Sequence, residues 1–156
     1  MNIFVLHDDP ILAANDQVDK HVVKMALETA QILSTCHRVL ESPNKEEVYK
    51  TTHVNHPCCV WARESKENYN WLYEHFIGLL EEYTYRYEKI HGCTKLVDIL
   101  RNNPVEVSKG RTRFALAMPD DYKVEDCVQS YRNYYNNDKR DIFSWKKRGV
   151  PKWIET

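Results

Sequence analysis

The chain has 156 residues, 42% of them hydrophobic and 29% charged, and its formal net charge is −1. This length suffices for one domain with its own core, and no apolar run approaches the roughly 18 residues that a membrane-spanning helix requires. The near-zero charge is unlike the basic excess of most duplex-DNA binders, whose affinity depends on neutralising phosphates.

Glycine, proline and cysteine usage indicates a helical protein from a reducing compartment. Only 4 Gly and 6 Pro are present, which favours long helices over strands and turns. The five cysteines are odd in number, and Cys58 and Cys59 are adjacent, so no disulfide framework is expected. The first residues lack the basic start and cleavage site of a signal peptide. We therefore expect a cytoplasmic protein with reduced thiols.

The first predicted element is a short extended N-terminal lead-in over residues 2–6, which are mostly apolar and precede Asp8 and Asp9. Either aspartate can cap a helical turn, because its carboxylate accepts hydrogen bonds from free helix N–H groups. Pro10 suits the first helical position. The sequence thus predicts a strand or extended segment and then a helix start.

A long central helix is predicted over about residues 18–40. Apolar side chains recur there at steps of three and four residues and define a buried face. A second face carries Val23, Leu27, Ala30 and Ser34. A helix that is apolar on two sides is expected to lie between other elements.

A stripe of polar side chains runs between those two faces. At ~100° per residue its members lie within about 80° of one another. Ionisable groups along one edge of a mostly buried helix are typical of a functional site, because buried charges are costly unless they are paired or used. The stripe consists of Gln17, His21, Lys24, Glu28, Gln31 and Thr35.

The remaining elements complete a mostly α fold, a single-domain compact helical bundle over residues 1–156. Capping residues, apolar periodicity and stop signals define them. The expected elements are a loop over 41–54, a helical segment from Asn55-His56-Pro57, a helix capped by Ser65 and stopped at Gly92, a short helix from Thr94 to Arg101, an irregular segment over 103–121, and a helix from about Val124 to Asn137 capped by Asp120 or Asp121.

Glu28 is the leading candidate for a general acid/base, since a carboxyl between apolar walls is suited to proton transfer. Lys24 lies four residues before it, and the alternative for this pair is an ordinary helix salt bridge. His21 could orient or share the proton, or could be a hydrogen-bonded core histidine. We expect Gln31 to shape the same cavity and His56 to face it.

Positive charge concentrates toward the C-terminus. Residues 1–108 hold 11 Lys/Arg against 16 Asp/Glu, whereas residues 109–156 hold 11 against 7. Arg111 and Arg113 predict an anion-binding loop, with a solvated charged loop as the alternative. The helix that follows offers stacking faces and cations for a base and its phosphate, although its tyrosines could equally be core-edge residues. This aromatic-basic set is Tyr131, Arg132, Tyr134, Tyr135, Lys139 and Arg140.

No metal or cofactor site is predicted. His53, His56, Cys58 and Cys59 do not follow a common zinc-ligand spacing. The sequence contains no Walker loop, dinucleotide fingerprint, nucleophile elbow or zinc-protease motif. Several large enzyme classes are therefore not expected.

Several segments resemble a group of short, largely uncharacterised phage and bacterial proteins. The resemblance covers nearly the whole chain and implies a phage-type protein, which would act in the host cytoplasm, but it implies no activity. The segments are Met1-Asn2-Ile3-Phe4-Val5-Leu6, Asp19-Lys20-His21-Val22-Val23-Lys24-Met25, Leu27-Glu28-Thr29-Ala30-Gln31, Asn55-His56-Pro57-Cys58, Glu82-Tyr83-Thr84-Tyr85-Arg86-Tyr87 and Ala117-Met118-Pro119-Asp120.

The chain also resembles the pyrimidine-dimer DNA glycosylase/lyase family of the phage endonuclease V type, whose members are helical and similar in length. Asp19-Lys20-His21 followed by Glu28 matches that family's spacing, and Tyr131-Arg132-Asn133-Tyr134-Tyr135 is similar to its aromatic cluster. The resemblance implies that Glu28 is the catalytic acid/base. It also implies that the amine of Asn2, exposed after Met1 is removed, attacks a sugar C1′ and forms a Schiff base. Asn2 is an unfavourable residue for that removal.

The leading hypothesis is therefore a DNA glycosylase/lyase-like enzyme of DNA repair or modification that acts on damaged or modified pyrimidines. Phosphate would be held by Arg111, Arg113 and Arg132. One alternative is an enzyme or binder of free nucleotides or another small anion, which the near-neutral charge favours. Another is a non-catalytic phage protein that binds a host factor. No membrane partner is expected, and the oligomeric state stays open.

Overall fold

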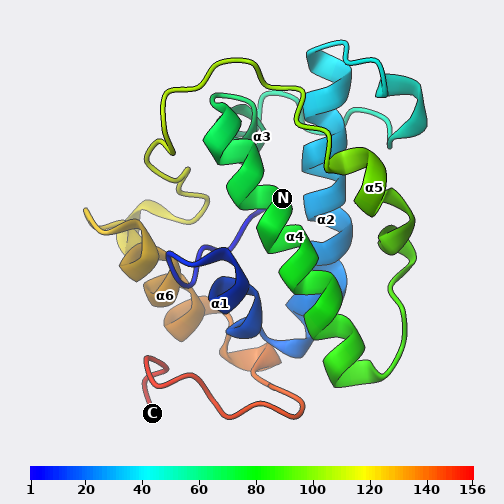
Figure 1. Cartoon of the computed structure of the whole chain (residues 1–156). Coiled ribbons are helices and arrows are strands. Elements are labelled where there is room, and N and C mark those ends of the chain that lie inside the picture. Colours follow the sequence, from blue (N-terminus) through cyan, green and yellow to red (C-terminus); the bar gives the residue numbers. More distant parts are fainter.

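The computed structural model describes all 156 residues, and its regular elements are helices without a β-strand, which confirms the mostly α prediction. Figure 1 shows the long helices α2 and α4 through the middle of the molecule, with α1 and α6 on one side and α5 on the other. A single hydrophobic cluster of 33 buried residues joins them. The α-helices are α1 (Pro10–Asn15), α2 (Asp19–Val39), α3 (Pro57–Ala62), α4 (Lys66–Tyr87), α5 (Val97–Leu100) and α6 (Cys127–Asp138), and the 3-10 helices are η1 (Lys45–Glu47), η2 (Gly92–Leu96), η3 (Asp120–Tyr122) and η4 (Arg140–Ile142).

Helix α2 is the predicted central helix, and its ends agree with the sequence to within one residue. Its main apolar stripe is buried from Val22 to Cys36. The second face is only half covered: Ala30 is buried, whereas Val23 and Leu27 are each 40% exposed. The expectation of burial on two sides was therefore wrong for the first half of α2, where Val23 and Leu27 stay partly open to solvent.

Helix caps follow the predicted chemistry at two starts. The Asp9 side chain accepts hydrogen bonds from the Ile11 and Leu12 N–H groups, and Ser65 accepts one from Asn68 N–H. The predicted stop of α4 was wrong: Glu88, with φ 55° and a left-handed backbone, ends the helix four residues before Gly92. A non-glycine residue can take this conformation at a small energetic cost.

The start of α6 also differs from the prediction. Asp120 begins the 3-10 helix η3, and Asp126 caps α6 by accepting a hydrogen bond from Gln129 N–H. The helix consequently begins at Cys127, three residues later than expected. Two acidic clusters lie close together here, and the sequence pattern could not choose between them.

The N-terminal lead-in passes between the helices and forms no strand. Ile3, Val5 and Leu6 are fully buried, and Phe4 is 4% exposed. Phe4 has φ 42°, a conformation that bulky side chains rarely adopt, so the segment is not extended throughout. Figure 1 shows the N-terminus in the middle of the molecule. The first residue of the chain thus lies beside α2.

A buried arginine ties the helices together below this segment. Arg86 of α4 is fully buried, and its Nε donates to Glu82 Oε2 at 2.7 Å while its Nη1 donates to Asp19 Oδ1 at 3.0 Å. Further donations reach the carbonyl oxygens of Asn15 and Gln17. Four of the five guanidinium protons thus have an acceptor, and two of the acceptors are carboxylates, as a buried cation requires.

Candidate active site at the N-terminal amine

A surface cavity of about 150 Å³ lies where the lead-in, α2 and the end of α6 meet. It is much smaller than the ~300–1,000 Å³ of sites that enclose a small molecule. Lys24 at its edge is 71% exposed, so the cavity opens to solvent. We call it the N-terminal cavity. It is lined by Met1, Asn2, Phe4, His21, Lys24, Met25, Glu28, Tyr134 and Lys139.

The carboxylate of Glu28 lies between two amines. Its Oε1 is 3.5 Å from the α-amine of Met1, and its Oε2 is 3.8 Å from Lys24 Nζ. The side chain is 12% exposed, and the buried Oε2 has no hydrogen-bond partner. A buried acceptor left without a partner is uncommon and costly. The carboxylate is therefore placed to accept a proton or a substrate group.

The lead-in is held in place by the side chain of Asn2. Its Oδ1 accepts hydrogen bonds from Ile3 N–H at 2.7 Å and Phe4 N–H at 2.9 Å. Its Nδ2 donates to Ala117 O at 2.7 Å. The amide thus bends the chain at its start and attaches it to the irregular segment before α6, which fixes the position of the N-terminal amine.

Phe4 forms an aromatic wall of the cavity together with its neighbours. Its ring stacks on His21 at 4.3 Å between centroids and on Tyr134 at 6.1 Å. The positive φ of Phe4 is a strained conformation that persists only where surrounding contacts hold it, and such residues cluster at functional sites. No sequence pattern indicates this role.

His21 is uncharged at neutral pH. Burial, together with the positive charges of Lys139 and Lys24, lowers its pKa to about 3. Its Nδ1 lies 2.6 Å from the hydroxyl of Tyr135, which accepts a hydrogen bond from Val18 N–H and therefore has its own proton free for His21. His21 is therefore a neutral hydrogen-bonding partner of Tyr135 here and does not act as a cation.

Three positive groups surround the single carboxylate. Besides the α-amine and Lys24, Lys139 lies 4.7 Å from the ring centroid of Tyr134 and 5.8 Å from that of Phe4. The charges around the N-terminal cavity therefore sum to an excess of positive charge. A cavity with one sign of charge attracts the opposite sign, which here means an anion such as phosphate.

His56 and Gln31 lie near this cavity without lining it. His56 caps α3, its Nδ1 accepting from Cys58 N–H. Burial lowers the pKa of His56, and the charge of the N-terminal amine lowers it further. Gln31 is half-buried on α2, three residues beyond Glu28.

The basic loop before α6 already binds a carboxylate of the protein. Lys109 N–H and Gly110 N–H both donate to Glu67 Oε1, and the Ser108 hydroxyl donates to its Oε2 at 2.6 Å. Arg111 stacks on the Phe114 ring at 4.0 Å. The loop amides are thus occupied by Glu67, and the arginines do not line the N-terminal cavity.

The aromatic-basic set of α6 divides between core and cavity. Tyr131 and Tyr135 are fully buried, and the Tyr131 hydroxyl donates to Ala115 O. Arg132 donates to Leu6 O at 3.0 Å and lies over the Trp153 ring. These three side chains hold the lead-in and the segments around it, whereas Tyr134 reaches the cavity.

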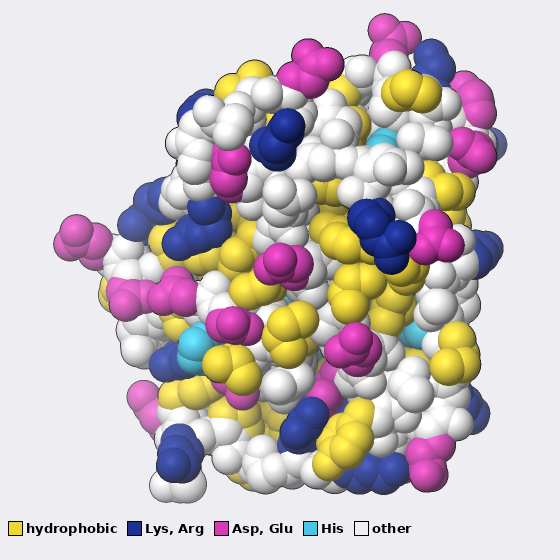
Figure 2. Space-filling model, viewed as in Figure 1, with side chains coloured by type: hydrophobic (Ala, Val, Ile, Leu, Met, Phe, Trp, Pro, Cys, Tyr) yellow, Lys and Arg dark blue, Asp and Glu magenta, His cyan; other side chains and the backbone are white.

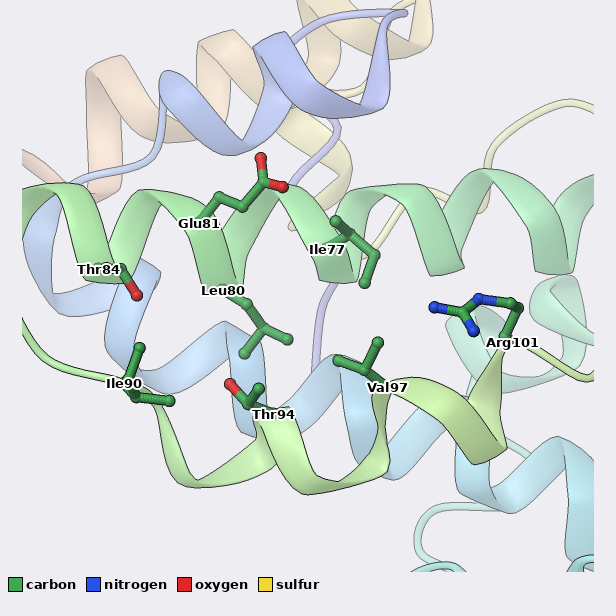
Figure 3. Close-up of a pocket in the computed structure, with 8 residues that line it drawn as sticks. All are labelled: Ile77, Leu80, Glu81, Thr84, Ile90, Thr94, Val97 and Arg101. Atoms are coloured by element: carbon green, nitrogen blue, oxygen red, sulfur yellow. The ribbon is translucent and has the colours of Figure 1, made fainter.

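A larger cavity of about 470 Å³ lies elsewhere, between α4 and the η2–α5 segment. Figure 3 shows Ile77 and Leu80 of α4 facing Val97 across it, with Arg101 at one end. Figure 2 shows hydrophobic side chains gathered in this region, whereas acidic and basic side chains are scattered over the rest of the face. No pair of groups suited to proton transfer and nucleophilic attack lies there, so we place the chemistry at the smaller cavity.

Two further observations concern the state of the cysteine thiols and the length of the apolar helices. All five cysteines are free, and burial raises the pKa of Cys58 to about 12 and that of Cys59 to about 11. These thiols are poor nucleophiles at neutral pH. No helix is long and apolar enough to span a bilayer.

The chain matches the model of one known family. A family model described as pyrimidine dimer DNA glycosylase matches residues 1–95, more than half of the chain. The matched range contains the lead-in and all of α2 with Glu28, but neither Tyr134 nor Lys139. No curated protein and no solved structure matches the chain.

Proposed function

This chain belongs to the pyrimidine dimer DNA glycosylase family, and we propose that it cleaves the glycosidic bond of a damaged or modified pyrimidine in DNA and then breaks the strand. The N-terminal α-amine is the nucleophile in this proposal, and Glu28 is the general acid/base. The observation that carries it is the approach of the amine to the Glu28 carboxylate, 3.5 Å apart at the surface cavity.

An N-terminal amine is suited to this reaction. An α-amine is less basic than a lysine side chain, so more of it is uncharged and nucleophilic near neutral pH. A neighbouring carboxylate can take the proton that the nitrogen must lose, and the partnerless Oε2 of Glu28 is available for a second contact.

The proposed steps conserve atoms and charge. The uncharged amine attacks C1′ of the target nucleotide, and the C1′–base bond breaks as the base leaves with the bonding electrons and takes a proton from solvent. The Glu28 carboxylate removes one proton from the attached nitrogen and then gives it to the sugar ring oxygen as the C1′–oxygen bond opens. The product is a protonated imine. A C2′ proton is then lost to solvent, the C3′–oxygen bond breaks, and the 3′-phosphate leaves with the bonding electrons. Water adds to the remaining imine and releases the enzyme amine.

Other predicted residues take supporting roles in the proposal. Lys24 and Lys139 hold the phosphates that flank the target nucleotide, while Gln31 and His56 contact the substrate from the sides of the site. Arg111 and Arg113 contact more distant phosphates. Tyr131, Arg132 and Tyr135 position the lead-in through their contacts with Ala115, Leu6 and Val18.

The small volume of the cavity favours DNA over a free nucleotide. A site of about 150 Å³ encloses a reacting sugar carbon more readily than a whole nucleotide, so the rest of the substrate must lie on the protein surface. Binding of a free nucleotide or another small anion is the second candidate, favoured by the net charge of −1.

Incision under single-turnover conditions tests the proposal. A duplex with one pyrimidine dimer is compared with the same duplex undamaged and with the same duplex bearing one abasic site. We expect strand breaks at the dimer and at the abasic site only. Cleavage of none of the three by folded protein would remove the proposed activity, and cleavage of the abasic duplex alone would leave a lyase without glycosylase action.

A further inference from the structure

Met1 is an integral part of the fold at the N-terminal cavity. Its side chain is 2% exposed, whereas the residue as a whole is half-buried, so its accessible surface belongs to main-chain atoms. The Met1 sulfur lies 3.4 Å from Cys59 Sγ of α3, which is itself buried. A flexible thioether fills irregular core space well. The side chain thus anchors the amine that points to Glu28.

The second residue cannot take over that position. Asn2 is 8% exposed, its side chain makes three hydrogen bonds, and Ile3 behind it is fully buried. Consecutive Cα atoms are ~3.8 Å apart, so an amine on Asn2 would start about one residue farther from Glu28. To reach the carboxylate, Asn2 would have to break the bonds that hold the lead-in.

We propose that Met1 is retained in the mature protein and that its own α-amine, rather than that of residue 2, is the nucleophile. The second residue, Asn2, has a large side chain, which is unfavourable for removal of Met1 and agrees with the geometry. This inference rests on the proposed function and specifies the reacting atom. In the covalent step, the Met1 nitrogen bonds to C1′ as the bond between C1′ and the base breaks. The bond between C1′ and the ring oxygen breaks afterwards, as the imine forms.

Three forms of the chain that differ only at the N-terminus test the inference. One starts at Met1, one at Asn2, and one carries a single glycine before Met1; all are released from a fusion that leaves no other residues. The extended form keeps the Met1 side chain in place and moves only the amine, so it separates chemistry from folding. Urea unfolding of each form verifies its stability.

The readout is borohydride trapping on a duplex with one abasic site and on one with a pyrimidine dimer, followed by peptide mass analysis. Displacement of a reacting group by about 1 Å can reduce a rate ~100-fold. We therefore expect an adduct on Met1 in the first form and at least ~100-fold slower trapping in the other two.

Each outcome has a distinct meaning. Equal or faster trapping by the form that starts at Asn2 would leave the proposed function intact and overturn the retained nucleophile. An intact mass without Met1 in protein expressed from its own start codon would overturn retention directly. Absence of trapping by all three folded forms would overturn the proposed function, and this inference with it.

Discussion

At the scale of single residues, the ion pair of Glu28 with Lys24 adds too little to the stability of the fold to explain why Glu28 is buried. Its pair with Lys24 has the less favoured order of charges along a helix and a separation of 3.8 Å, and Lys24 is 71% exposed. Such an exposed pair contributes well under 1 kcal/mol. The side chain is nevertheless largely buried, with one oxygen unpartnered. The proposed acid/base role would account for this arrangement, because proton transfer needs a free carboxylate oxygen.

We predict that Glu28→Gln reduces incision of a dimer-containing duplex by at least ~100-fold, because a general acid/base contributes about that much or more. The free energy of unfolding should change by less than about 1 kcal/mol, since the substitution keeps shape and removes only weak ion pairs. Single-turnover incision and urea unfolding measure the two effects. Glu74→Gln, at an exposed position of α4, is the matched control. A variant that unfolds, or one that cleaves normally, would contradict the role of Glu28.

Sequence reasoning found the half of the site that lies on one helix. His21, Lys24 and Glu28 share an edge of α2, and helical spacing alone brings them together. The other half depends on chain paths that bring residues more than 100 positions apart into contact, as with Phe4 and Lys139. Phe4 also sits in a strained conformation that no local pattern encodes.

Between helices, neutral histidines form buried links. His37 of α2 lies 2.9 Å from the Tyr69 hydroxyl of α4, and His75 of α4 lies 2.8 Å from Pro10 O of α1. Burial lowers the pKa of His37 to about 4 and that of His75 to about 4. With His21, whose pKa is about 3, three side chains must gain protons when the chain unfolds in mild acid.

We predict that stability falls as the pH falls below about 6.5, the ordinary histidine value. In this range the unfolded chain binds more protons than the folded one, so protonation favours unfolding. Each histidine contributes up to about 1.4 kcal/mol per pH unit until its folded pKa is reached. Urea unfolding between about pH 7 and about pH 5, above the range of ordinary carboxylates, measures the slope. His75→Gln should reduce it by about one proton, and a flat profile would contradict the burial of neutral histidines.

A second prediction concerns Arg86, whose buried side chain joins α4 to the N-terminal half of the chain. Arg86→Leu should destabilise the protein by ~3–5 kcal/mol, because it leaves the Glu82 carboxylate buried with only the partly exposed Arg148 as a partner. Arg101→Leu, which breaks an exposed pair with Asp98, should change stability by less than about 1 kcal/mol. Urea unfolding of both variants measures the difference. Equal effects would mean that the buried network is not needed to hold α4 to the N-terminal half.

Element positions could be predicted where the signal was local. Periodicity and capping located α2 and the starts of α1, α3 and α4. Exposure could not be predicted in the same way, since Val23 and Leu27 fit an apolar face that the fold leaves partly exposed. The role of Arg86 could not be predicted, because its acceptors belong to other segments and come together only in the folded chain.

The positive and negative charges of the whole molecule nearly cancel, but positive groups outnumber negative ones around Glu28. If the substrate is duplex DNA, each neutralised phosphate releases a counterion and adds about −0.9 to the slope of log affinity against log salt. We predict that Lys139→Met makes this slope shallower by about one unit, because Lys139 lines the cavity. Lys89→Met, at an exposed lysine after α4, should leave the slope unchanged. A shallow slope for wild type would instead favour a free nucleotide or another small anion.

The most direct test of the account is borohydride trapping of the wild-type protein on a duplex that carries one pyrimidine dimer, with the undamaged duplex beside it. An imine between protein and sugar can be reduced to a stable bond only if an amine has replaced the base at C1′. We predict a covalent adduct on the N-terminal residue with the dimer duplex and none with the undamaged one. A folded protein that forms no adduct, or forms one equally on both duplexes, would contradict the central claim.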